Sequence, residues 1–137
     1  MRHKVLAYIT RRHLGRRQLL VFDHRDHPDA GTQVPAGTVE PGEPVEQALW
    51  REVAEESGLR PEQLRFGRKL AEQAEAEWDQ IRHVFHLEAA AALPETWEHR
   101  VAGSGEDAGL VFVYRWADLD VRLAGHQHRW LPDLAGG

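Results

Sequence analysis

Hydrophobic and polar positions near the start of the chain predict a β-hairpin. Two apolar runs rich in strand-forming residues, Val5 to Thr10 and Gln18 to Phe22, are separated by the polar segment RRHLGRR. Such runs joined by a turn that contains glycine are typical of a hairpin. The basic tip offers cations to a phosphate, but charged residues commonly decorate exposed tips and protect sheet edges. We therefore expect a hairpin whose tip has no special function.

Three further runs are strand-like: Leu64 to Ala71, Ile81 to Ala89 and Leu110 to Trp116. Turn-forming residues fill positions 23 to 32, and positions 94 to 109 indicate a second long loop. The segment 71 to 77, AEQAEAE, fits either a strand or a helix, and the tail from Ala117 to Leu134 is expected to hold one or two short helices. Strands on both sides of one strong helix predict a single α+β domain over residues 1–137, with helices packed on a mixed sheet.

The strong helix is predicted from Pro44 to Ser57. Pro44 suits the first helical position, where its missing N–H costs nothing, and Gly58 offers the left-handed conformation that ends a helix. At 100° per residue, Val45, Ala48 and Leu49 share one face.

On the same face, the positions after Leu49 turn from apolar to acidic. Glu52 and Glu56 continue the apolar stripe, and Glu55 points within about 100° of them. Like charges three and four residues apart repel, and carboxylates near a helix C-terminus oppose its dipole. A divalent cation would convert this repulsion into attraction, and clustered carboxylate oxygens suit Mg²⁺ or Mn²⁺. The bland alternative is a solvated acidic helix end.

Composition narrows the classes of function. The chain has 137 residues, 42% of them hydrophobic, which fits one globular core. Acidic residues outnumber basic ones by 22 to 17, so neither nucleic acid nor an anionic membrane is an expected partner. The absence of cysteine excludes disulfides and thiol nucleophiles. The N-terminal apolar run is too short for a signal peptide or a membrane span, and we expect a soluble, cytoplasmic protein.

The acidic helix belongs to a longer pattern. After Gly37 and five residues comes Glu43, and seven residues later comes REVAEESGL, which runs from Arg51 to Leu59. This resembles the Nudix box, G-x5-E-x7-R-E-U-x-E-E-x-G-U with U aliphatic, at every defined position. The resemblance implies an α-β-α sandwich around a mixed sheet, and hydrolysis of nucleoside diphosphates linked to another moiety with Mg²⁺ or Mn²⁺.

The resemblance also assigns roles. It implies Glu52, Glu55 and Glu56 as metal ligands, with the backbone carbonyl of Gly37 as an additional ligand. It implies that Glu52 or Glu55 handles the attacking water. Arg51 resembles the family arginine that pairs with the first glutamate of the box, here Glu43, in a structural ion pair; an exposed pair of this kind would be worth at most about 1 kcal/mol.

A further acid is expected from a late loop. In several Nudix enzymes such a glutamate joins the metals or acts as the base, and the segment VAGSGEDAGL offers Glu106 before the last long strand. Glu98 and Asp107 are the alternatives. With this acid, the candidate catalytic residues are Glu52, Glu55 and Glu106.

The substrate is not identified by the sequence. The segment from Gln63 to Glu77 lacks the proline and tyrosine markers of known subfamilies, so a small nucleotide-type substrate is as far as the pattern leads. Trp78 and Trp97 could stack on a base, although packing is the more common role of tryptophan. The sequence does not decide whether the protein is a monomer or a homodimer. The alternative function is a Nudix-like sensor that binds a nucleotide without cleaving it, but such sensors typically lose box acids that this chain keeps.

Overall fold

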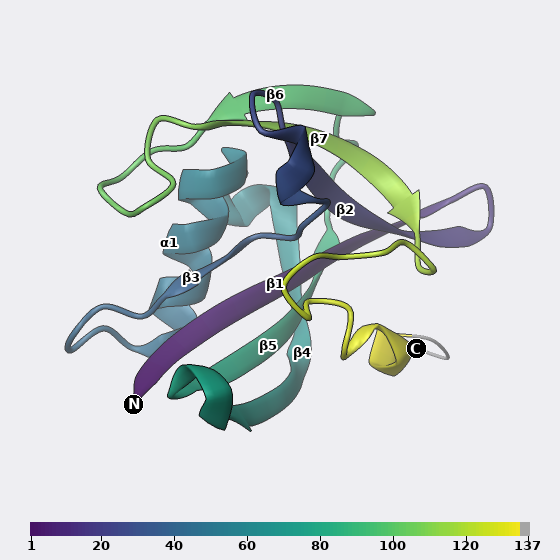
Figure 1. Ribbon diagram of the computed structural model, residues 1–137. Helices are drawn as coiled ribbons and strands as arrows, with labels where there is room; N and C mark the ends of the chain where they lie inside the picture. Colours follow the sequence, from purple (N-terminus) through teal and green to yellow (C-terminus); the bar gives the residue numbers. More distant parts are fainter. Residues whose placement is uncertain (135–137) are drawn as a thin grey trace.

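The computed structural model describes residues 1–134, in which one α-helix packs against a mixed sheet (Figure 1). Residues 135–137, the end of the expected domain, lie outside the described part. The elements are β1 (Arg2–His13), β2 (Arg16–His24), β3 (Ala36–Thr38), α1 (Val45–Ser57), β4 (Leu64–Glu75), β5 (Gln80–Ala89), β6 (Thr96–Arg100) and β7 (Val111–Asp118). Short 3₁₀ turns occupy Pro28–Ala30, Pro61–Gln63, Ala76–Trp78 and Leu131–Leu134.

Strand β1 organises the sheet, whose order is β4-β5-β1-β2-β7-β6. It pairs in parallel with β5 along one edge. Its other edge is divided: residues Lys4 to Leu6 pair with β3, and residues Thr10 to His13 pair with β2. The start of β1 therefore lies beside the segment that leads from β3 into α1.

Alternation along β1 supplies both cores of the molecule. Val5, Ala7 and Ile9 face α1 and pack in the cluster that contains its buried residues Ala48 and Leu49. Side chains of successive strand residues point to opposite faces. Leu6 and Tyr8 accordingly face the other way, into a second cluster that is closed by the tail through residues such as Leu123, Trp130, Leu131 and Leu134. The tail thus provides the second covering layer, with a 3₁₀ turn at Leu131–Leu134 as its short helix.

The predicted hairpin, helix and three strands are present. The helix begins one residue later than expected, because Pro44 has extended ψ of 144° and acts as the N-cap, with its carbonyl accepting the N–H of Ala48 at 3.0 Å. Strand β4 continues to Glu75, so the helical alternative for the AEQAEAE segment is wrong up to that residue. No helix within residues 1–134 is long and apolar enough to cross a membrane.

Two strands do not follow from the hydrophobic pattern. Strand β6 lies inside the predicted loop 94 to 109, where it pairs with β7 as an edge strand. Its residues alternate between exposed and half-buried, and none of them is buried, so the segment lacks an apolar run. Strand β3 has three residues and is held by its pairing with β1. Both strands flank α1 and position the candidate site.

Candidate functional site

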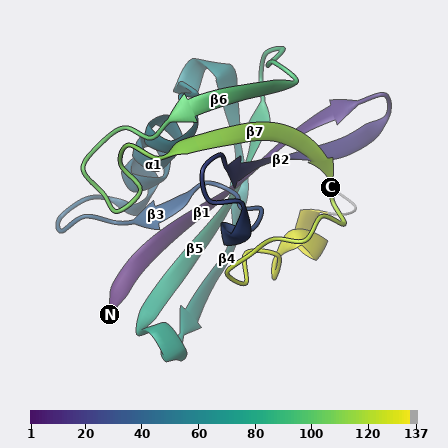
Figure 2. The ribbon, with the colours of Figure 1, turned by 45° about the horizontal axis from the view of Figure 1, so that its top comes forward.

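The C-terminal end of α1 is fixed by donors from other elements. Gly58 takes the left-handed conformation at φ 77° and its N–H binds the carbonyl of Ala54. In the last turn of the helix, the carbonyl of Glu55 accepts hydrogen bonds from Nε2 of His99 and from the N–H of Ala102, each at 2.9 Å. Helix ends leave such carbonyls without intrahelical partners. Strand β6 and the segment after it therefore hold the acidic turn in place (Figure 2).

The same turn receives two aromatic donors. The Trp97 indole donates to the carbonyl of Ser57 at 3.0 Å, and the Tyr114 hydroxyl donates to the carbonyl of Glu56 at 2.9 Å. The two rings stack with centroids 5.0 Å apart. Trp97 therefore packs against the helix end and is not presented to a ligand. Trp78 differs, since it is 38% exposed and touches the His126 ring edge-on at 5.2 Å.

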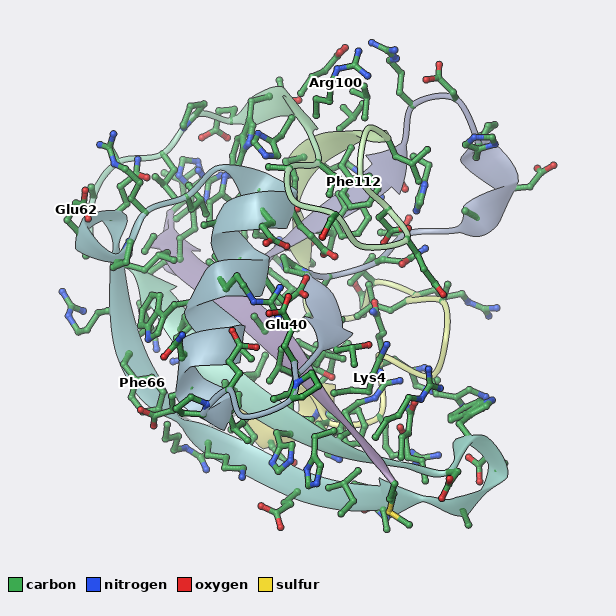
Figure 3. The ribbon with its side chains drawn as sticks, turned by 90° about the vertical axis from the view of Figure 1, so that its left-hand side faces the viewer. Lys4, Glu40, Glu62, Phe66, Arg100 and Phe112 are labelled. Atoms are coloured by element: carbon green, nitrogen blue, oxygen red, sulfur yellow. The ribbon has the colours of Figure 1, made fainter. Side chains whose placement is uncertain are left out.

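A cavity of about 400 Å³ lies beside this end of α1 and brings the predicted carboxylates together. Its walls come from the start of β1, β3 and the turn after it, α1, and the loop between β6 and β7 (Figure 3). Six carboxylates line it: Glu40, Glu52, Glu55, Glu56, Glu106 and Asp107. Three cations line it as well: Arg2, Lys4 and Arg51.

Arg51 is the centre of an ion-pair network. It binds Glu43 in bidentate fashion, with N–O distances of 2.8 and 3.0 Å, and also reaches Glu52 at 2.8 Å and Glu55 at 3.3 Å. Its remaining N–H group donates to the carbonyl of Thr38 at 2.9 Å, which ties α1 to the end of β3. The Glu43 side chain is 7% exposed and that of Arg51 22%, so the pair is partly buried and the value for an exposed pair does not apply to it. Removing Arg51 would leave the Glu43 carboxylate without its counter-ion, whereas Arg51 without Glu43 would keep Glu52 and Glu55.

Burial raises the pKa of two box glutamates. Glu56 is 5% exposed, and its carboxylate accepts the N–H of Ala36 at 3.1 Å. Desolvation, followed by the charge of Glu52, raises the pKa of Glu56 well above its usual value. Desolvation likewise raises the pKa of Glu52, against the opposing effect of Arg51. A positive charge placed in the cavity would favour the ionised form of both groups.

Two glycines allow backbone to approach the carboxylates. A Cβ atom on Gly37 would lie 2.0 Å from Cδ of Glu52, and one on Gly103 would lie 2.7 Å from Cδ of Glu55. Contacts below 3.0 Å require the neighbour to shift. Gly103 also has φ of 88°, which favours glycine. The backbone at Gly37, in which we expected a carbonyl ligand, is thus in direct contact with a predicted ligand.

The structure separates the three candidates for the late acid. Glu106 and Asp107 both line the cavity, from the loop between β6 and β7. Glu98 lies on β6, is not among the lining residues, and pairs with Arg25 at 3.3 Å. Geometry therefore favours Glu106 or Asp107 for any role in the cavity.

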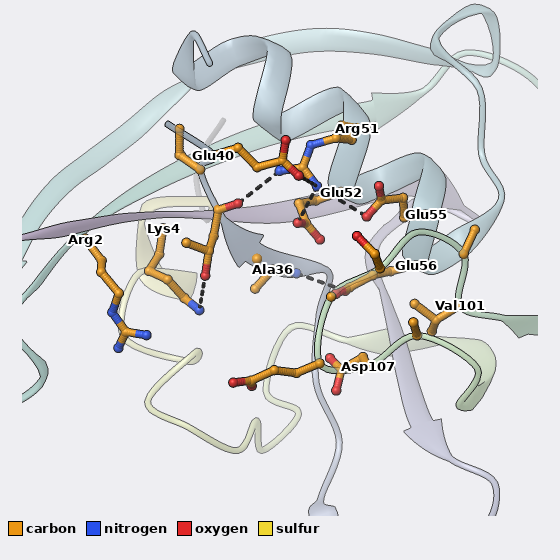
Figure 4. A pocket seen from close by; sticks show the side chains of 18 of the residues that line it. Arg2, Lys4, Ala36, Glu40, Arg51, Glu52, Glu55, Glu56, Val101 and Asp107 are labelled. Atoms are coloured by element: carbon orange, nitrogen blue, oxygen red, sulfur yellow. Dashed lines mark hydrogen bonds and ion pairs between the residues drawn. The ribbon is translucent and has the colours of Figure 1, made fainter. Parts of the chain in front are cut away.

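Sequence reasoning missed the cations of β1. Arg2 and Lys4 line the cavity on the side away from the α1 carboxylates (Figure 4), and Nζ of Lys4 donates to the Thr38 hydroxyl at 3.0 Å. Nothing in their local sequence distinguishes them from other surface cations. They reach the cavity because β3, which carries Gly37, pairs antiparallel with the start of β1, a pairing that the sequence does not predict.

The donor chemistry of the cavity suits Mg²⁺ or Mn²⁺. Oxygen ligands are the preferred partners of both ions, and Glu52, Glu55 and Glu56 supply them from one helix face beside Gly37. Within residues 1–134, however, no three side chains form a ready-made metal cluster. Arg51 holds Glu52 and Glu55 instead. Cation binding would therefore require these two carboxylates to turn from Arg51 toward Glu56.

Comparison with known proteins adds a family and a relative. The model of the NUDIX domain family matches residues 2–134. An RNA pyrophosphohydrolase from Roseobacter denitrificans is 31% identical over 123 residues, which span 86% of this chain and 70% of the relative.

Solved structures share the fold at low identity. An Ap4A hydrolase from C. elegans in a binary complex has a TM-score of 0.69 and 20% identity, with 96% of this chain and 95% of that chain covered. The NUDIX domain of Shewanella oneidensis NrtR, complexed with ADP ribose, has a TM-score of 0.61 and 17% identity, with 96% and 84% covered. At these identities the likeness concerns the fold alone.

Proposed function

Because this chain belongs to the Nudix hydrolase family, we propose that it cleaves a nucleoside diphosphate linked to another moiety, or a nucleoside triphosphate, with Mg²⁺ or Mn²⁺. Family membership and the curated relative make it a diphosphohydrolase; the cation and the substrate are the proposal. The observation that carries it is the meeting of the three α1 carboxylates with Gly37 in one cavity.

The charges of the cavity support this chemistry. A diphosphate repels nucleophiles, and bound cations would neutralise its oxygens and lower the pKa of an attacking water. Glu52, Glu55 and Glu56 are the proposed ligands, with the Gly37 carbonyl. In this proposal Glu52 or Glu55 orients the water, and an acid of the late loop that lines the cavity, Glu106 or Asp107, accepts its proton. The attack breaks a bond between phosphorus and a bridging oxygen, so one phosphate gains the water oxygen.

Arg51 and Glu43 have a structural role in this proposal. Their bidentate pair and the bond from Arg51 to the Thr38 carbonyl fix the turn after β3 against α1. This keeps Gly37 at contact distance from Glu52. Bidentate arginine–carboxylate pairs combine strength with a defined geometry, which suits a positioning role.

The decisive experiment is a substrate panel with Mg²⁺. It contains nucleotide sugars, coenzyme A and nucleoside triphosphates, which carry the proposed type of bond. It also contains ADP-ribose, a dinucleoside polyphosphate and an RNA oligonucleotide with a 5′-triphosphate, because the names of the similar proteins point to these three classes. Cleavage in ¹⁸O water then identifies the phosphorus that is attacked.

Two variants with the same chemical change serve as controls for the panel. Glu52→Gln should abolish cleavage, whereas Glu98→Gln, on β6 outside the cavity, should retain it. Tight binding of one compound without cleavage of any of them would replace the enzyme with the sensor alternative. Cleavage by both variants at the wild-type rate would contradict the assigned site.

A further inference from the structure

Lys4 differs from Arg51, the cation on the α1 side of the cavity, because no carboxylate forms an ion pair with it. Its Nζ donates to the Thr38 hydroxyl at 3.0 Å, and within residues 1–134 it forms no ion pair. Arg51, on the α1 side of the same cavity, lies within 4 Å of four carboxylates. The cavity carboxylates therefore form no direct ion pair with Lys4, and only the more distant charges of Glu106 and Glu52 favour its charged form.

The surroundings of Lys4 are unfavourable for a positive charge. The residue is half-buried, and Arg82 lies next to it in the register of β1 and β5. Burial lowers the pKa of Lys4, and the charges of Arg2 and Arg82 lower it further, against weaker opposing effects of Glu106 and Glu52. Arg82 is itself compensated by Glu75 at 3.0 Å, whereas Lys4 has only a neutral hydroxyl.

Arg2 lies on the same side of the strand. Residues two apart on a strand point to the same face, and both line the cavity. The two positive charges repel each other at the wall of the cavity, and Lys4 has no ion-pair partner there. An anion that enters the cavity would therefore stabilise them. Thr38 fixes the ammonium group in advance, so less rotamer entropy is lost when an anion binds.

We infer that Lys4, assisted by Arg2, binds a phosphate group of the substrate on the wall of the cavity opposite the α1 carboxylates. This inference rests on the proposed function and adds a binding residue to it. A diphosphate would then lie between two walls of the cavity. The α1 carboxylates would bind it through cations, and the β1 residues would contact its phosphate oxygens directly. Lys4 suits this role because an ammonium group carries three donors and no acceptor. Thr38 is a positioning residue that holds it.

The test measures binding of methylenediphosphonate, whose P–C–P bridge water does not cleave, by calorimetry in the presence of Mg²⁺. Lys4→Met should raise its Kd by about tenfold or more, as expected for loss of a hydrogen bond from a charged group. Lys4→Arg should retain most of the affinity. The matched control is Lys69→Met, which removes the same charge from the other lysine of the chain, on β4, where it pairs with Glu72.

Each outcome separates the inference from the proposed function. A tenfold loss in Lys4→Met with less than a twofold change in Lys69→Met supports the inference, and equal losses in the two variants overturn it, because the effect would then come from net charge. Wild-type protein that does not bind the probe also overturns it. Wild-type protein that binds the probe through Lys4 but cleaves no compound of the substrate panel retains the inference and contradicts the proposed function. If Lys4→Met lowers the melting temperature, Lys4→Gln is measured in its place.

Discussion

Gly37 and Glu52 are in such close contact that a Cβ atom on Gly37 would lie 2.0 Å from Cδ of Glu52. Both residues line the cavity, where the contact joins β3, with its predicted carbonyl ligand, to α1, with its predicted carboxylate ligand. Glu52 is also held by Arg51 at 2.8 Å, which limits its freedom to move away. The contact therefore makes the position of Glu52 sensitive to any side chain at residue 37.

Gly37→Ala should lower kcat/KM by about 100-fold, because a displacement of about 1 Å in a reacting group can have that effect. Its effect on stability should be small, because the new Cβ meets only the carboxylate end of the flexible Glu52 side chain, which can shift. The control is Gly105→Ala, which lines the same cavity with nothing within 4 Å of its new Cβ and should have near wild-type values. Steady-state kinetics and urea unfolding measure both effects. A Gly37→Ala protein with wild-type kcat/KM would contradict a catalytic need for the position that Glu52 takes beside Gly37.

The box glutamates lead to a prediction about metal. Mg²⁺ should raise the unfolding free energy of wild-type protein by about 2.7 kcal/mol at a hundredfold excess over its Kd. Glu52→Gln and Glu56→Gln should each lose this shift and lower turnover by about two to four orders of magnitude. Without metal, Glu56→Gln should be as stable as wild type or more stable, since it removes a buried charge that Glu52 repels. Thermal melts across millimolar Mg²⁺ test this, and an unchanged wild-type midpoint would exclude the metal site.

Much of the fold follows from the sequence because its signals are local. The periods of 3.6 and 2 predict α1 and the strands β1, β2, β4, β5 and β7, and Gly58 marks the end of α1. Strand β6 was missed because an edge strand with alternating polar residues has no apolar run to indicate it. Strand β3 was missed because three residues form a strand only when β1 provides the partner.

The candidate site divides in the same way. Glu52, Glu55 and Glu56 lie on one helix face, so their convergence follows from helical geometry. Lys4 reaches the cavity only through the pairing of β1 with β3, which no pattern of charges indicates. The capping of the helix end by Trp97, His99 and Tyr114 likewise depends on contacts between distant segments. Sequence reasoning therefore finds the carboxylates, but it misses the lysine on the opposite wall and the side chains that fix the helix end.

The late loop permits a direct comparison of its two acids. Both Glu106 and Asp107 line the cavity, so one of Glu106→Gln and Asp107→Asn should lower kcat by about 100-fold or more if that acid accepts the proton of the water. Glu98→Gln should change kcat by less than twofold, since Glu98 lies outside the lining and pairs with Arg25. Stopped assays with the best substrate of the panel give the three values. Near wild-type rates in both loop variants would leave proton transfer to Glu52 or Glu55.

His83 leads to a prediction about pH. Its Nδ1 lies 2.8 Å from Nζ of Lys69, and its Nε2 lies 2.9 Å from Nδ1 of His3, in a group that also includes Glu72 at 3.4 Å. The lysine is a donor only, so His83 accepts at Nδ1 and donates from Nε2 to His3. Burial, followed by the charge of Lys69, lowers the pKa of His83 below its ordinary value of 6.5.

The sign of the effect on stability follows from proton binding. At pH below 6.5 the unfolded chain binds a proton at His83 more readily than the folded protein, so this stabilising contribution is present above pH 6.5 and is lost as the pH falls through the lowered pKa of the folded state. His86, whose pKa is also lowered by burial, acts in the same direction.

His83→Gln should therefore reduce, but not abolish, the loss of unfolding free energy between about pH 7.5 and pH 5. Urea unfolding at a series of pH values measures this, with His13→Gln, an exposed residue at the hairpin tip, as the control that should follow wild type. Parallel pH profiles for wild type and His83→Gln would show that His83 is protonated equally in the folded and unfolded states.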